Sequence, residues 1–207
     1  MKKIAVLVSG GGTNLQALLE AERRGEIVNG QISLVISSQE DAYALTRAAN
    51  FGVEAVVIAR KGKKRETFTQ ALVDCLKAHD IDLVIFAGFM VILSPLFFDE
   101  YENRAMNVHP ALIPSFCGEG FYGLHVHEKV LEYGVKLSGA TVHFANAVTD
   151  GGPIILQKAV DVREDDTPET LQRRIMEECE WKLLPQAASL FCQDKLRVEG
   201  RIVKILD

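Results

Sequence analysis

Short apolar runs alternate with amphipathic segments from the first residues of the chain onward. Five runs rich in β-branched residues predict buried strands at 3–8, 32–36, 55–58, 83–86 and 105–108. Between them, apolar residues recur at helical spacing, as at Leu15, Leu18 and Leu19. This alternation predicts an α/β fold: a Rossmann-like, doubly wound, mostly parallel sheet with helices on both faces.

The second half of the chain continues the pattern with longer elements. We expect a helix at 124–133 and two strands at 137–145 and 154–162, on either side of an Asp-Gly-Gly-Pro turn. Thr167 and Pro168 predict the start of a long C-terminal helix, with Thr167 as its cap. A short hairpin follows, with strands at 195–198 and 201–205.

Composition narrows the class of protein. The chain has 207 residues, 48% apolar and 25% charged, which is enough for one sizeable core and a single domain at 1–207. A net charge of −5 disfavours nucleic-acid or anionic-membrane partners. No apolar stretch is long enough for a membrane span, and the one after Lys2-Lys3 is too short for a signal peptide, so we expect a cytoplasmic protein. The four cysteines lack a C-x-x-C pair and are expected to be reduced.

Candidate chemistry lies at two strand ends. Asn107 and His109 close one strand, and Asp150 follows another. An amide and a protonated imidazole can donate to an oxygen that becomes negative during acyl transfer, and a carboxylate can raise the imidazole pKa and orient the ring. Each residue alone is also consistent with a turn Asn, a satisfied His or an Asp-Gly-Gly turn.

Three segments of the chain are expected to meet at one edge of the sheet. In a doubly wound sheet, ligands bind beyond the carboxyl ends of the strands, where the strand order reverses. Residues 9–14, 88–93 and 107–109 follow the first, fourth and fifth predicted strands. If the first and fourth strands are neighbours, these segments line one crevice.

The glycine-rich segment Gly10-Gly11-Gly12 opens the first helix. Exposed amides at a helix start suit an anion such as phosphate. Dinucleotide binding is the weaker alternative, because Leu15 replaces the third fingerprint glycine and no ribose-binding acid follows Ser37-Ser38. A structural turn with a capping box of Thr13 and Gln16 also fits.

Further segments favour structural interpretations. The basic cluster around Arg65 could hold an anion, but its lysines (Lys61, Lys63 and Lys64) favour a solvated loop. The apolar run at 87–93 could wall a flat aromatic ligand, although core is favoured. His125 and His127 have poor spacing for a shared metal and are interpreted as helix-start or surface residues.

Taken together, these motifs resemble the glycinamide ribonucleotide formyltransferases over nearly the whole chain, from residues 4–10 through 87–90, 107–110 and 150–153 to Glu180. The resemblance implies transfer of a formyl group from 10-formyltetrahydrofolate, as co-substrate, to the amine of glycinamide ribonucleotide, in purine synthesis. It implies no metal and no covalent enzyme intermediate. We expect only these small molecules as partners, and a monomer or homodimer.

The resemblance also assigns residues. Residues 1–100 would mainly bind phosphate, and 101–207 would carry catalysis and folate binding. The catalytic residues would be Asn107, His109 and Asp150. The substrate would contact Gly12, Thr13, Asn14, Leu15, Glu177 and Glu180, with Glu180 the firmer of the two acids. The folate would contact Arg65, Met90, Val91, Ile92, Leu93, Asn146, Ala147, Val148 and Thr149.

Some features depart from the family pattern. The loop at 115–123 is longer than in many members, Trp181 stands where a histidine is common, and an acidic residue often found before the aspartate is missing. The trio itself is intact.

Three other functions compete with this interpretation. A formyltetrahydrofolate deformylase uses a similar trio with water as nucleophile, but such relatives carry a domain before the first strand and lack the Gly12-Thr13-Asn14-Leu15 turn. Transfer to initiator tRNA is disfavoured by the lack of a further C-terminal domain and of a basic surface. A non-catalytic nucleotide-binding module on the same fold would tolerate the loss of His109.

Overall fold

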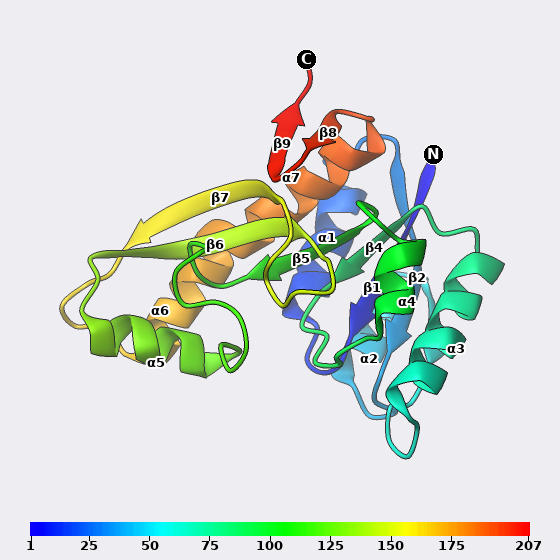
Figure 1. The fold of residues 1–207 in the computed structure, drawn as a ribbon, viewed down its shortest axis with the longest axis horizontal. Coiled ribbons are helices and arrows are strands. Elements are labelled where there is room, and N and C mark those ends of the chain that lie inside the picture. Colours follow the sequence, from blue (N-terminus) through cyan, green and yellow to red (C-terminus); the bar gives the residue numbers. More distant parts are fainter.

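A nine-stranded mixed sheet runs through the whole molecule (Figure 1). The computed structural model describes residues 1–207, and the strand order is β3-β2-β1-β4-β5-β6-β7-β9-β8. In chain order, the elements are β1 (Lys2–Val8), α1 (Thr13–Arg23), β2 (Gly30–Ser37), α2 (Tyr43–Asn50), β3 (Glu54–Val57), α3 (Arg65–Ala78), β4 (Leu83–Phe86), α4 (Pro95–Glu100), β5 (Ala105–His109), α5 (Leu124–Tyr133), β6 (Leu137–Phe144), β7 (Ile154–Asp161), α6 (Pro168–Ile175), the π-helix η1 (Met176–Glu180), α7 (Trp181–Cys192), β8 (Leu196–Glu199) and β9 (Ile202–Ile205).

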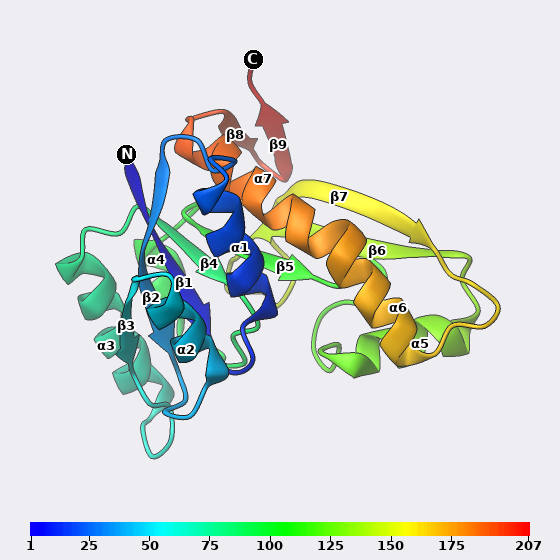
Figure 2. The ribbon, with the colours of Figure 1, turned by 180° about the vertical axis from the view of Figure 1, so that it is seen from behind.

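The first five strands form the predicted parallel, doubly wound half. Strand β1 pairs in parallel with both β2 and β4, so the order reverses between them as expected. Alternate residues of β1 enter different cores: Ile4, Val6 and Val8 join one hydrophobic cluster, and Ala5 and Leu7 join the other. Helices α1, α2, α6 and α7 cover the first cluster, and α3 and α4 cover the second (Figures 1 and 2). The predicted fold class is confirmed.

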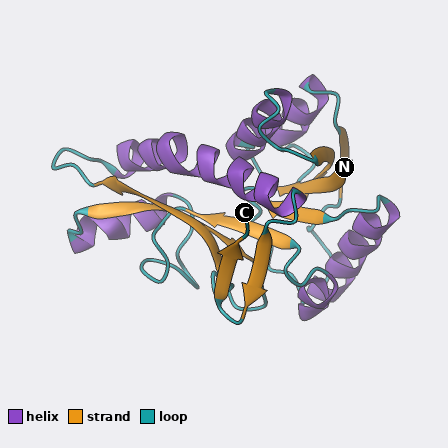
Figure 3. Ribbon diagram, turned by 90° about the horizontal axis from the view of Figure 1, so that it is seen from above, coloured by secondary structure: helices purple, strands orange, loops and turns teal.

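The second half of the sheet is largely antiparallel. Strand β6 pairs antiparallel with β5 and with β7, and the C-terminal hairpin β8–β9 joins the edge through a parallel pair, Ile154 with Ile202. Seen from above, the hairpin projects beyond the rest of the sheet (Figure 3). The predicted hairpin and the strands on either side of the Asp-Gly-Gly-Pro turn are confirmed to within two residues.

The C-terminal helix begins where the sequence predicts. The Thr167 hydroxyl accepts from the Thr170 N–H, and the Thr170 hydroxyl accepts from the Thr167 N–H. These two hydrogen bonds form a capping box. Helices α6, η1 and α7 then follow without a break along one face of the sheet (Figure 2). The π-helical turn between them ends at Glu180, a residue that the sequence assigned to the site. No helix combines the length and the apolar character that crossing a membrane would require.

Candidate active site

Three loops meet at the carboxyl ends of β1, β4 and β5. These strands are adjacent in the sheet, and Phe86 at the end of β4 pairs with Asn107 in β5. The Ser9 hydroxyl, just after β1, accepts from the Met90 N–H at 3.0 Å and lies 2.7 Å from the hydroxyl of Ser38 after β2. The predicted convergence of residues 9–14, 88–93 and 107–109 on one rim is therefore confirmed.

Strand β5 presents Asn107 and His109 on the same face, because side chains two apart along a strand point the same way. The intervening Val108 belongs to the first hydrophobic cluster, so the two polar residues face away from α1 and α7. On the neighbouring strand β6, His143 lies opposite Asn107, and Thr141 lies opposite His109. Antiparallel pairing thus brings a second histidine into the group.

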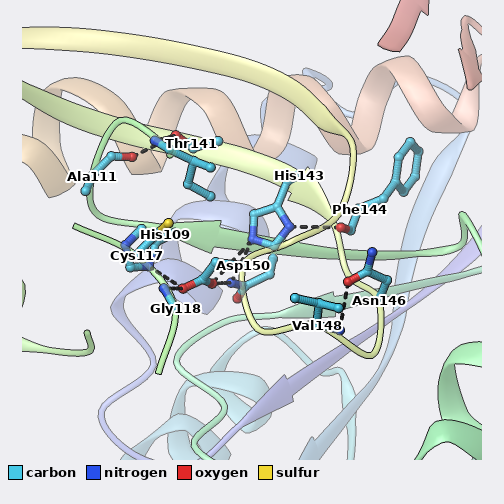
Figure 4. Close-up of polar contacts among 12 residues, drawn as sticks. His109, Ala111, Cys117, Gly118, Thr141, His143, Phe144, Asn146, Val148 and Asp150 are labelled. Atoms are coloured by element: carbon cyan, nitrogen blue, oxygen red, sulfur yellow. Dashed lines mark hydrogen bonds and ion pairs between the residues drawn. The ribbon is translucent and has the colours of Figure 1, made fainter. Parts of the chain in front are cut away.

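Asp150 lies at the centre of this group (Figure 4). Its Oδ2 is 3.4 Å from Nδ1 of His109, and its Oδ1 is 3.5 Å from Nδ2 of Asn107 and 3.6 Å from Nε2 of His143. The Asp150 side chain is 7% exposed and that of His109 5%, so water screens their interaction weakly. The three predicted residues therefore form one polar cluster, in which the side chains of His109 and Asp150 are buried and Asn107 is partly buried.

The turn after β6 holds Asp150 in place. Asp150 has a positive φ of 53°, which Asp tolerates better than most residues. Gly152 then passes so close to β6 that a Cβ at this position would lie 1.7 Å from the carbonyl oxygen of Phe144. Only glycine fits there. The backbone path therefore requires Gly152, and the polar cluster requires the carboxylate of Asp150.

The loop at 115–123 closes over the cluster. Nε2 of His109 lies 2.8 Å from the carbonyl oxygen of Phe116, and the N–H of Gly118 donates to Oδ2 of Asp150 at 2.9 Å. A carbonyl oxygen can only accept, so Nε2 of His109 carries a proton. The loop therefore occupies hydrogen-bonding positions of both His109 and Asp150.

Burial dominates the electrostatics of His109. It lowers the pKa of His109 below the ordinary value, and outweighs the Asp150 carboxylate and the Phe116 carbonyl, which both favour the protonated ring. The expectation of a net upward shift is thus wrong, because the sequence does not reveal how completely the loop covers the ring. Burial raises the pKa of Asp150, but contacts with His143, His109 and Gly118 lower it by more, so Asp150 stays ionised at neutral pH.

His143 is the residue that the sequence analysis missed. It is 2% exposed, its Nε2 lies 3.3 Å from Nδ2 of Asn107, and its Nδ1 lies 2.8 Å from the carbonyl oxygen of Phe144. The carbonyl oxygen of Phe144 can only accept, so Nδ1 of His143 carries a proton. The available signal was a histidine inside an otherwise apolar strand directly before the Asp-Gly-Gly-Pro turn.

The glycine-rich loop forms the start of α1, without the predicted capping box. Gly12 is the N-cap in a left-handed conformation (φ 73°), and neither Thr13 nor Gln16 caps the helix. The capping-box interpretation is wrong, because Gln16 instead bonds Arg47 and Glu20. The backbone N–H groups of residues 11–14 donate to no other group in the protein. They remain open to an anion, as expected.

Glu180 closes the inner side of this loop. Its carboxylate is buried and accepts from Nδ2 of Asn14 at 2.8 Å. Burial raises the pKa of Glu180 to about 7, and the Asn14 donor partly opposes that rise. The remaining amide oxygen of Asn14 is buried and accepts no hydrogen bond. Glu177, by contrast, is exposed and makes no polar contact with these residues.

The predicted folate residues lie mainly at the surface. Met90 and Ile92 are 61% and 75% exposed, so interpreting them as core is wrong, whereas Leu93 is buried in the second hydrophobic cluster. Val91 is half-buried and packs against that cluster. Residues 146–149 are exposed, and Arg65 is exposed and paired with Glu66.

The expectations for the basic cluster and for the two histidines of α5 are confirmed only in part. The three lysines before α3 are exposed, as predicted. His125 is a half-exposed residue near the start of α5 and pairs with Glu128. His127 is fully buried, and both of its ring nitrogens lack a hydrogen-bond partner, so the surface interpretation of His127 is wrong. Burial lowers the pKa of His127 to about 4, with His109 adding to the effect.

Comparison with known proteins identifies the class. Residues 2–188 match the model of the formyl transferase family, which is most of the chain. The chain therefore belongs to the formyl transferase family and is a group-transfer enzyme.

The most similar relatives narrow the family. Phosphoribosylglycinamide formyltransferase of Haemophilus influenzae is 36% identical over 203 residues, which are 98% of this chain and 92% of that protein. The crystal structure of glycinamide ribonucleotide transformylase 1 from Symbiobacterium toebii is 45% identical, with a TM-score of 0.93, and the match covers 100% of this chain and 95% of that one. The predicted resemblance to this group of enzymes is confirmed.

The fold is also shared with a hydrolase. The crystal structure of a formyltetrahydrofolate deformylase from Pseudomonas syringae is 25% identical, with a TM-score of 0.88. The match covers all of this chain and 66% of that one. The fold alone therefore leaves the acceptor of the formyl group to be argued from the rest of the site.

Proposed function

We propose that this enzyme transfers the formyl group of 10-formyltetrahydrofolate to the amine of glycinamide ribonucleotide, a step of purine biosynthesis. The observation that carries the proposal is the polar cluster of Asn107, His109 and Asp150, which lies on the same rim as a loop with free backbone N–H groups. The cluster can stabilise a carbonyl oxygen that becomes negative, and the N–H groups of the loop can bind a phosphate.

The cluster supports direct transfer. When the amine attacks the formyl carbon, a C–N bond forms and the formyl oxygen becomes negative. The N–H donors of Asn107 and His109 stabilise that oxygen, and loss of one such donor typically costs a factor of about 10² to 10³ in turnover. The bond to the folate nitrogen then breaks, and the proton of the amine passes to that nitrogen. His109, or a water held by Asp150, relays the proton.

The loop at 115–123 bears on this mechanism. The Nε2–H that would meet the oxyanion donates to the Phe116 carbonyl in this structure. Productive binding therefore exchanges the Phe116 contact for a contact with the formyl oxygen. The N–H of Gly118 likewise donates to the Asp150 carboxylate, at a position that a bound water or substrate group would take over.

The substrate phosphate would bind the N–H groups of Gly12, Thr13, Asn14 and Leu15 at the positive end of α1. Two features fit a substrate next to this loop: the unpaired amide oxygen of Asn14 needs a donor, and the Glu180 carboxylate can accept from a hydroxyl or an amine. Glu177 would contribute only at the rim, since its side chain is exposed. Residues 1–100 would thus mainly bind phosphate.

The folate would lie against exposed apolar side chains. Met90, Ile92 and Val148 are each more than 60% exposed and so are available to an apolar ring. Val91, Asn146, Ala147 and Thr149 complete this wall, Leu93 supports it from the core, and Arg65 would meet an acidic end of the folate. Residues 101–207 would carry catalysis and the remaining folate contacts.

A spectroscopic assay of folate turnover, with and without glycinamide ribonucleotide, tests the proposal. Turnover that depends on the amine supports the transferase. Turnover without the amine selects a deformylase. That function is the second candidate because the deformylase from Pseudomonas syringae shares the fold. No turnover, with ligand binding retained, selects a binding module. Asn107→Ala should reduce turnover by about 10² to 10³ in either enzyme, which links the activity to this cluster.

A further inference from the structure

Arg47 reaches from α2 to the glycine-rich loop. Its Nε donates to the carbonyl oxygen of Gly11 at 2.8 Å, and its Nη1 donates to Oε1 of Gln16 at 3.0 Å. The guanidinium carbon lies 5.0 Å from the centre of the Tyr43 ring. These contacts hold the guanidinium plane beside the first turn of α1. Nη2 makes no hydrogen bond, so its donors are free.

Close packing fixes the helix that carries Arg47. The Ala44 N–H in the first turn of α2 donates to the carbonyl oxygen of Gly10 at 3.1 Å. A Cβ on Gly12 would lie 2.7 Å from Cβ of Ala44, so loop and helix touch with no space for a larger residue. Arg47 follows one turn later, and the α2 backbone therefore delivers it to the loop.

No carboxylate pairs with Arg47, although its place in the last turn of α2 suits a cation. Arg47 forms no ion pair, and no other lysine or arginine hydrogen-bonds to residues 9–16. The guanidinium itself lies beside the first turn of α1, where a positive charge opposes the dipole of that helix. Arg47 thus places an unpaired cation beside the free backbone N–H groups of residues 11–14. Both features favour binding of an anion.

We infer that Arg47 binds the phosphate of the substrate and selects for it. Two of its donors hold the loop, and Nη2 donates to a phosphate oxygen on the outer side of the backbone N–H groups. This inference rests on the proposed function, in which that loop binds the phosphate. Arginine suits the role because its planar fork can bond the loop and an anion at the same time.

The test compares glycinamide ribonucleotide with the corresponding riboside, which keeps the amine and lacks the phosphate. Affinity is measured by calorimetry and KM by formyl transfer. Arg47→Met removes the charge and keeps most of the apolar stem, and Arg47→Lys keeps the charge and loses the fork. Arg23→Met is the matched control, because Arg23 also stacks on an aromatic ring, 5.1 Å from the centre of Phe51, away from the loop.

Arg47→Met should weaken ribonucleotide binding about 10- to 100-fold, the effect typical of a charge-assisted hydrogen bond, and change riboside binding less than about twofold. Arg47→Lys should fall between, and Arg23→Met should match the wild type. Equal losses for both ligands, or no loss, would overturn the inference. If Arg47→Met does not fold, a ribonucleotide-specific loss in Arg47→Lys supports the inference and its absence overturns it. A wild type that binds the ribonucleotide more tightly than the riboside, yet transfers no formyl group, refutes the proposed function alone.

Discussion

Replacing Glu180 by glutamine should remove a pH-dependent cost from the folded state. Its carboxylate is 6% exposed and has one hydrogen-bond donor, Nδ2 of Asn14. Burial raises its pKa to about 7 from 4.5. The folded protein therefore binds the Glu180 proton more tightly than the unfolded chain does.

The sign and size of the effect follow from that difference. Because the folded pKa is the higher one, this group's contribution to stability is fully present below the unfolded pKa and is lost as the pH rises through the folded pKa. For pKa values of 4.5 and about 7, the loss between pH 5 and pH 8 is about 2 to 3 kcal/mol. Glutamine has nearly the same shape and no charge, so the variant should not show this loss.

Urea unfolding at pH 5 and pH 8, followed by circular dichroism, measures the difference. The free energy of unfolding of Glu180→Gln, minus that of the wild type, should rise by about 2 to 3 kcal/mol from pH 5 to pH 8. Trp181, the only tryptophan, lies directly after Glu180 and offers fluorescence as a second probe. Glu177→Gln on the same π-helical turn is the control, because its side chain is exposed.

The outcome that would refute the reasoning is a difference between Glu180→Gln and wild type that is the same at both pH values. It would mean that the carboxylate is solvated in the folded protein. A parallel change in the Glu177→Gln control would instead show that the measurement reports general surface charge.

Further predictions concern three other positions. Asp150→Asn should lower turnover strongly with little change in unfolding temperature; near-normal turnover at neutral pH would remove its proposed role. Gly152→Ala should destabilise the fold by more than about 3 kcal/mol, because its Cβ would lie 1.7 Å from the Phe144 carbonyl oxygen, and a small loss in urea unfolding would contradict this packing. The pKa of buried His127 falls to about 4 from 6.5, so the neutral ring is favoured on folding and stability should drop by about 3 kcal/mol as the pH falls through that range. His127→Leu should abolish this drop, and a drop that persists in the variant would exclude His127 as its source.

Much of the fold follows from local patterns that the sequence carries. Runs of β-branched residues separated by helical periodicity predict the five parallel strands, and Thr167 with Pro168 predicts the start of the C-terminal helix. The polar residues of β5 could also be placed, since a spacing of two puts Asn107 and His109 on one face. The reversal of strand order then brings the loops after β1, β4 and β5 to one rim.

Properties set by contacts between distant residues required the tertiary structure. The antiparallel register of β5 and β6 adds His143 to the cluster, and packing of α2 on the glycine loop brings in Arg47. Burial of His109 under the loop at 115–123 reverses the direction of its expected pKa shift, and burial of His127 overturns its surface assignment. The reason is physical: periodicity along a chain reports which way a side chain points, whereas desolvation and charge pairing depend on what other segments place next to it.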